Sequence, residues 1–140
     1  MKTILLDCRD RVLLWVGEKV DAGSFADDAQ AIGWEKNGEL VAGVVFEKWD
    51  GPNIFMHVAV TEGMVVTKRD LRIVFSYPFT HLKCNRVTGL VRVDNIKAQR
   101  FDEHLGFVRE GQLRQAHSDG TDMYVYGMTS KECRWIGVNK

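Results

Sequence analysis

One histidine in an apolar, strand-like segment could accept and release protons. His57 lies within 54–60, and an imidazole side chain changes charge close to neutral pH. Alternation along a strand places His57 on one face with Phe55 and Ala59, and it places three apolar residues on the other face: Met56, Val58 and Val60. His57 therefore has two interpretations, a general base or a hydrogen-bonded structural residue.

Two basic residues at the start of a long amphipathic segment could contact phosphate. Apolar residues recur at helical spacing over 67–82, which predicts a helix with Thr67 as its N-cap. Lys68 and Arg69 then occupy the first helical turn, where they could form charge-assisted hydrogen bonds to phosphate or simply lie in solvent. Pro78 removes one backbone hydrogen bond, so the end of this helix should be irregular.

Turn residues divide the rest of the chain into strands and helices. Asn37-Gly38 and Asp50-Gly51-Pro52 separate three apolar segments, which predicts two antiparallel hairpins from strands over 31–35, 40–47 and 54–60. Four more strands are expected over 2–6, 86–93, 107–113 and 122–128. Helices are expected over 11–20, from an N-cap at Ser24 to about 30, and from a cap at 94–95 to about 104, ended by Gly106. The predicted order is βααβββαβαββ, which favours a mixed sheet with helices packed on its faces.

Composition restricts the function classes. The 140 residues suit one domain, and the charge balances at 19 basic against 19 acidic residues, without a basic, aromatic-rich stretch. Direct nucleic-acid binding is therefore not expected. Three widely spaced cysteines, Cys8, Cys84 and Cys133, favour neither a disulfide framework nor a zinc site, and they fit a reducing cytoplasm. No segment approaches 18 uninterrupted apolar residues, so we expect no membrane-spanning helix.

The stretch from 86 to 111 resembles GNAT-family N-acetyltransferases. The matching positions are Asn95, Ala98, Leu105, Gly106, Phe107, Glu110 and Gly111. The Arg-Val at 86–87, the helix end at 77–79 and the Gly-x-x-Asp-like segment at 120–123 make the ribosomal-protein N-terminal acetyltransferase branch the most similar. The resemblance spans 31–128. It implies an α/β (α+β) fold in a single domain over 1–140, with a mixed, mostly antiparallel central sheet, a splay between two central strands and helices on both faces.

The resemblance also implies acetyl-CoA as co-substrate. The pantetheine arm would enter between the strands at 54–60 and 86–93, and the following loop and helix N-terminus would hold the pyrophosphate. The implied cofactor contacts are Val58, Val60, Gly63, Met64, Val65, Val66, Thr67, Lys68, Arg69, Asn95, Ala98 and Arg100. Asn95 also suits a helix N-cap, and Arg100 could instead pair with Asp102 or Glu103.

The phosphate loop departs from the family pattern Gln/Arg-x-x-Gly-x-Gly/Ala. Glu62 stands at the first position, Val65 at the central glycine and Thr67 at the last position. A β-branched side chain at a point of close backbone approach crowds a phosphate, and Glu62 adds a negative charge. Weakened cofactor binding follows from this departure.

Catalysis in the family commonly uses a Glu on the splayed strand and a Tyr in the late helix. This chain has His57 in the strand, and it has Asp102 where the tyrosine usually lies. An ordinary carboxyl pKa suits a solvated helix residue better than an acid for a thiolate. Tyr124 and Tyr126, which alternate on the last strand, could replace the missing acid or serve in packing.

The favoured function is therefore an acetyl-CoA-dependent N-acetyltransferase, in which a primary amine attacks the thioester directly. The acceptor would be a small molecule, a protein N-terminus or a lysine, bound between 22–29 and 115–121. The alternative is a non-catalytic GNAT-fold binding protein with an eroded pyrophosphate loop. Trp135 and Ile136 could pack on the domain or on a second subunit, which leaves a homodimer as an open alternative.

Overall fold

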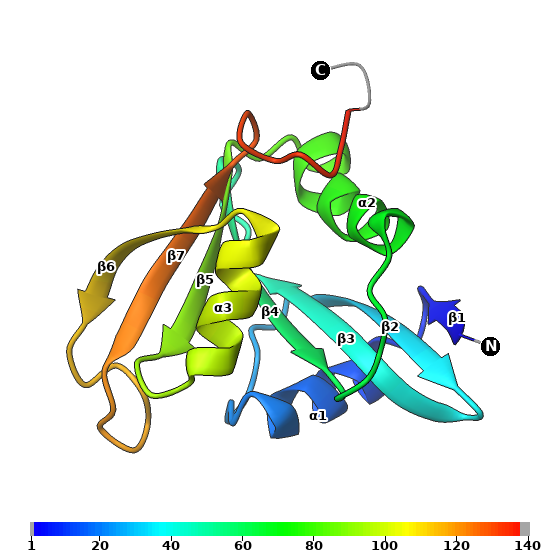
Figure 1. Ribbon diagram of the computed structural model, residues 1–140, viewed down its shortest axis with the longest axis horizontal. Coiled ribbons are helices and arrows are strands. Elements are labelled where there is room, and N and C mark those ends of the chain that lie inside the picture. The colour runs from blue at the N-terminus through cyan, green and yellow to red at the C-terminus, as the bar shows by residue number, and fades with distance from the viewer. Residues whose placement is uncertain (1, 138–140) are drawn as a thin grey trace.

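Seven strands form one sheet in the computed structural model, which describes residues 2–137 (Figure 1). The spatial order is β1-β2-β3-β4-β5-β7-β6, and every neighbouring pair is antiparallel except β4 and β5. The strands are β1 (Lys2–Leu5), β2 (Gln30–Lys36), β3 (Glu39–Glu47), β4 (Asn53–Val60), β5 (Arg86–Arg92), β6 (Val108–Leu113) and β7 (Met123–Thr129). The expected mixed, mostly antiparallel sheet is confirmed.

Helices cover both faces of the sheet (Figure 1). They are α1 (Arg9–Lys19), α2 (Lys68–Ser76), the π-helix η1 (Tyr77–His81) and α3 (Ile96–Leu105). On one face α1 buries Val12 and Val16 against Val45 and Ala59. On the other face α2, η1 and α3 cover a larger core that includes Val44, Phe46, Met56, Leu71, Phe75, Phe79 and Leu105. The alternation of β3 thus sends successive valines to opposite cores.

Two glycines allow α1 to approach the sheet closely. A Cβ added at Gly43 would lie 2.6 Å from Val16 Cγ2, and one added at Gly33 would lie 2.7 Å from Val12 Cγ2. Real Cβ atoms do not approach so closely, because interiors are already packed at crystal-like density. The two glycines therefore set the depth at which α1 packs.

The expected helix starting at Ser24 is wrong. Residues 20–29 form turns, and their polar groups bond to other parts of the chain. Asp28 accepts hydrogen bonds from the backbone N–H groups of Lys48 and Trp49 at 2.9 and 3.0 Å. The backbone N–H of Ala26 donates to Glu47 at 2.7 Å. Asp28, which resembled a residue of a first helical turn, therefore caps a neighbouring turn, and no helix lies between α1 and β2.

The other element boundaries agree with the sequence within a few residues. Thr67 is the N-cap of α2, and the helix changes to the π-helix η1 around Pro78, which confirms the expected irregularity. Asn95 caps α3 by accepting from the N–H of Ala98 at 3.1 Å. Gly106 ends α3 with a φ of 112°. Trp135 then donates its indole N–H to the Leu105 carbonyl at 2.8 Å, so this tail residue packs on its own domain.

Candidate active site

The central strands β4 and β5 separate partway along their length. They pair through only three residue pairs, of which Phe55 with Thr88 is the last, although β4 continues to Val60 and β5 to Arg92. Figure 1 shows the two arrows diverging toward their carboxyl ends, which confirms the predicted splay. The backbone groups of β4 that face β5 beyond Phe55 consequently have no strand partner among residues 2–137.

The residue of β5 just past the last pair is a glycine. A Cβ at Gly89 would lie 3.8 Å from the Met56 carbonyl oxygen and 3.8 Å from Asp102 Oδ2. The Asp102 carboxylate of α3 is thus close to the point where the two strands part. The gap between the two strands therefore begins with the side-chain-free backbone of Gly89 on β5 and the unpaired edge of β4.

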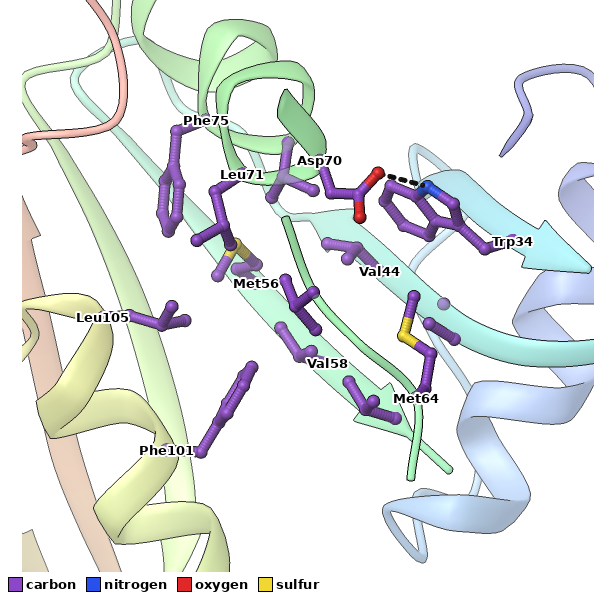
Figure 2. A pocket seen from close by; sticks show the side chains of 15 residues that line it. Trp34, Val44, Met56, Val58, Met64, Asp70, Leu71, Phe75, Phe101 and Leu105 are labelled. Carbon is purple, nitrogen blue, oxygen red and sulfur yellow. Dashed lines mark hydrogen bonds between the residues drawn. The ribbon is translucent and has the colours of Figure 1, made fainter. Parts of the chain in front are cut away.

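An apolar pocket lies on the α2 and α3 face beside the open edge of β4 (Figure 2). Its cavity volume is about 30 Å³, and an apolar cavity of this size stays dry. Four of the predicted cofactor residues line it: Val58, Val60, Met64 and Val66. Phe101 and Leu105 of α3 line it from the opposite side. The structure therefore brings these four predicted residues together in one apolar wall.

His57 points to the other face, toward α1, and forms a buried pair. Its Nε2 lies 2.5 Å from Glu47 Oε2, and the His57 and Phe25 ring centroids are 5.0 Å apart. Glu47 is only 5% exposed and also accepts the Ala26 N–H. Burial alone would raise the pKa of Glu47, but the hydrogen bonds from His57 and Ala26 outweigh it and hold that pKa below its ordinary value.

The charge of Glu47 fixes the proton on the histidine ring. An ionised carboxylate can only accept, so Nε2 of His57 must donate in the bond between them. Nδ1 forms no hydrogen bond within residues 2–137. His57 is structurally anchored through Nε2 while Nδ1 is not engaged by a described residue, so its two interpretations do not conflict. Sequence analysis missed Glu47, which lies at the end of β3 and offers no local signal.

Asp102 differs from the solvated residue expected from the sequence. It is half-buried on α3, and no group in residues 2–137 donates a hydrogen bond to its carboxyl. Burial, with a smaller contribution from the charge of Glu103, raises its pKa to about 7. The expectation of an ordinary carboxyl pKa is therefore wrong. Asp102 therefore keeps its proton to a higher pH than an exposed carboxyl does.

The two tyrosines of β7 have other partners. Tyr126 is fully buried and donates to Glu103 Oε2 at 2.6 Å, and burial together with this bond raises its pKa to about 12. Tyr124 packs beneath the Arg109 guanidinium, which lies 4.3 Å from the ring centroid. Since β5 separates β7 from β4, neither tyrosine lies on a strand that borders the splay from the β4 side. Packing is the better-supported interpretation for both.

The N-terminus of α2 contains a capping box that the sequence analysis overlooked. Asp70 accepts the Thr67 N–H at 3.0 Å, and Thr67 Oγ1 accepts the Asp70 N–H at 3.1 Å. Trp34 donates its indole N–H to Asp70 at 3.1 Å (Figure 2), and Lys2 also bonds the carboxylate. Burial would raise the pKa of Asp70, but the bonds from Lys2 and Thr67 lower it below its ordinary value. The Thr-x-x-Asp spacing at 67–70 was the available signal.

The remaining predicted cofactor residues are arranged around the ends of these elements. Gly63 has a φ of 84° in the loop after β4, and the Val65 side chain is 73% exposed. Lys68, Arg69 and Arg100 are exposed, and in the described part of the chain none of them forms an ion pair. The alternative pairing of Arg100 with neighbouring acids is therefore not observed. The exposed Asn95 and half-buried Ala98 begin α3 through the cap described above.

The two segments expected to bind the acceptor lie near each other. His117, in the loop between β6 and β7, has its Nε2 3.7 Å from Asp21 Oδ2, just before the segment 22–29. Arg92 at the end of β5 holds the same loop through Asp119 at 2.6 Å and Thr121 at 3.2 Å. The late loop is thus fixed beside the turns that follow α1.

Two other kinds of feature are absent from residues 2–137. No group of three or more His, Cys, Asp and Glu side chains is arranged to hold a metal ion. In the same residues, no helix has both the length and the apolar character that crossing a membrane requires.

Comparison with known proteins identifies the fold. No protein-family model and no curated protein matches the sequence. A chimera of the SpeG spermidine N-acetyltransferase from Vibrio cholerae and hSSAT has a TM-score of 0.73 at 15% identity, over 93% of this chain and 96% of that chain. A protein from T. thermophilus, assigned as an acetyltransferase, has a TM-score of 0.66 at 22% identity, over 76% of this chain. This chain covers 62% of the T. thermophilus protein. At these identities the similarity shows a shared architecture, and the chain has the GNAT acetyltransferase fold.

Proposed function

We propose that this protein is an N-acetyltransferase that uses acetyl-CoA and modifies a primary amine by direct attack. The observation that supports this most is the early end of the β4–β5 pairing in a sheet that acetyltransferases share. An open strand edge offers unpaired N–H and C=O groups, and the amides of an extended ligand can pair with them as an added strand would. A pantetheine arm has such amides.

The residues around the splay fit the acyl-carrying arm. The open edge of β4 at Val58 and Val60 would pair with its amides, while Phe101 would cover its apolar part. Asn95 keeps its side-chain NH₂ available, since its oxygen caps α3. When bound, acetyl-CoA supplies an activated thioester carbonyl at this place.

Proton transfer would be divided between the two faces of the sheet. The amine nitrogen attacks the thioester carbonyl, so a C–N bond forms and the C–S bond breaks. Nδ1 of His57 takes the proton that the amine loses, and the ionised Glu47 stabilises the resulting imidazolium. The protonated form of Asp102 supplies a proton to the departing sulfur. The sulfur leaves as a thiol, and every proton is accounted for.

The acceptor is a primary amine that approaches from the α1 face, where His57 lies. The turns at 22–29 and the loop at 115–121 border this face. The solved SpeG structures are spermidine N-acetyltransferases, which supports an amine as the acceptor. Small amines, protein N-termini and lysine side chains are all included in the proposal. One solved SpeG structure is dodecameric, which is consistent with a homodimer of this chain. Trp135 packs on its own domain, so this residue gives the homodimer no support.

The test combines binding with turnover. Native mass spectrometry of the purified chain should detect bound CoA, and incubation with radiolabelled acetyl-CoA should label an amine panel of polyamines, N-terminal peptides and lysine peptides. Absence of CoA binding would favour the second candidate, a non-catalytic binding protein with an eroded pyrophosphate loop. That candidate is favoured by one observation, the Asp70 carboxylate at the N-terminus of α2. Absence of both binding and labelling would refute the transferase.

A further inference from the structure

We infer that the chain supplies its own anion at the N-terminus of α2, so that the acyl donor is recognised through its pantetheine arm and not through its diphosphate. This inference rests on the proposed function and specifies the donor class for the same site. If it is correct, acetyl-pantetheine and related short thioesters should serve as acyl donors about as well as acetyl-CoA does.

Asp70 occupies the position that an anionic ligand would take. A helix N-terminus binds anions because its first N–H groups are unpaired and point outward. Here the Asp70 carboxylate accepts the Thr67 N–H, the Trp34 indole N–H and the Lys2 ammonium group. Thr67 in turn accepts the Asp70 N–H through its hydroxyl. Two of the four N-terminal N–H groups, those of Thr67 and Asp70, are thereby used within the protein, and the N–H of Leu71 forms the first regular helical bond, to the Thr67 carbonyl.

The charge on Asp70 opposes a second anion at this place. The side chain is 11% exposed, and its ion pair and hydrogen bonds lower its pKa, so that it is ionised at neutral pH. A diphosphate beside it would meet a like charge that the Lys2 ammonium offsets only in part. Displacing Asp70 instead would leave Lys2 and the Trp34 indole without their buried acceptor. Whether Asp70 stays in place or is displaced, most of the free energy that a bound diphosphate could contribute is lost.

The loop before α2 is also held in a form that suits phosphate poorly. Lys2 donates a second hydrogen bond, to the Val65 carbonyl at 2.9 Å, which ties the loop to β1. The side chain of Val65 is 73% exposed at a position where close approach to a phosphate needs a bare backbone. Glu62 is exposed in the same loop. Lys68 and Arg69 remain as exposed cations, so we expect a weak, salt-sensitive phosphate contribution and not a complete absence of one.

The deciding experiment is calorimetric titration of the whole chain with CoA and with pantetheine. We expect dissociation constants within about tenfold of each other, whereas a diphosphate bound at a helix N-terminus would separate them by about a hundredfold or more. A hundredfold preference for CoA would overturn the inference while leaving the transferase intact. Binding of neither ligand would instead refute the proposed function, and this inference would fall with it.

A charge-removing variant provides the second measurement. Asp70→Asn keeps the shape of the side chain but removes its charge, so CoA should bind at least about fivefold more tightly while pantetheine binds as before. Asp10→Asn is the matched control, because it removes one acidic charge from an exposed position on α1, and it should change neither constant. An Asp70→Asn protein that folds and shows no selective gain for CoA would count against the inference. If this variant does not fold, the comparison of CoA with pantetheine on the wild-type chain decides the question.

Discussion

Replacing Asp102 by asparagine should stabilise the protein at alkaline pH and leave its stability unchanged in acid. Burial, and less strongly the charge of Glu103, raises the pKa of this carboxyl from 3.8 to about 7. Between these two values the folded state keeps a proton that the unfolded state has lost, so stability falls as pH rises through this window. Three pKa units correspond to about 4 kcal/mol. Partial contact with solvent reduces the expected cost of ionised Asp102 to roughly 2–4 kcal/mol.

Asparagine at 102 cannot ionise, so Asp102→Asn avoids this loss. Urea unfolding of both proteins at about pH 4, 6 and 8 should give equal free energies of unfolding at the lowest pH and a gain for the variant at the highest. Asp10→Asn, which changes an exposed carboxyl, should follow the wild type at every pH. A gain that is the same at all three pH values, or no gain at pH 8, would refute the burial argument. Activity gives a separate readout: the variant should lose turnover even though it is more stable.

Three further substitutions test other parts of the structure. Glu47→Gln should lower kcat by about tenfold or more and shift the pH profile of activity, with cofactor affinity unchanged. The reason is that a neutral amide neither fixes the tautomer of the His57 ring nor stabilises its protonated form. An unaltered pH profile would make the role of Glu47 purely structural. Gly43→Ala should destabilise the fold by about 1–3 kcal/mol in thermal unfolding, since its Cβ would lie 2.6 Å from Val16 Cγ2. Trp34→Phe should cost about 1–3 kcal/mol by removing the indole donor from the α2 cap, and a change below the error of the melt would contradict that bond.

Elements whose signals are local were predictable from the sequence. The hairpins, the Asn95 cap and the Gly106 end of α3 each depend on a few adjacent residues, and each is confirmed. The helix expected after Ser24 is not formed, because the Asp28 carboxylate bonds to backbone groups about twenty positions away. The helix propensity of neighbouring residues cannot show that a side chain caps a turn elsewhere in the chain.

The chemistry of the site was less predictable than the fold for the same reason. Spacing placed His57 on a strand face, but its partner Glu47 lies ten residues away on β3. The raised pKa of Asp102 arises from burial between α3 and the splay, which sequence spacing does not specify. Asp70 appeared as one polar position in an amphipathic helix, and only the fold brings Lys2 and Trp34 to it.

In the proposed mechanism, the divergence of β4 and β5 would let His57 and Asp102 act on a common point from the two faces of the sheet. In a continuous sheet, the α1 face and the α3 face are separated by a hydrogen-bonded backbone layer, so His57 and Asp102 could not serve the same reacting atoms. Here the pairing of β4 with β5 stops at Phe55, two residues before His57. The Asp102 carboxylate lies close to Gly89, across the opening between the strands. An acceptor entering from the α1 face and a thioester held on the α3 face would therefore meet inside the sheet. A substitution that restores side-chain bulk at the opening tests this directly: Gly89→Val should lower turnover strongly, and Gly89→Ala should change the melting temperature little, because its Cβ would meet only contacts of 3.8 Å. If Gly89→Val retained full activity, the opening between the strands would not be where the reaction takes place.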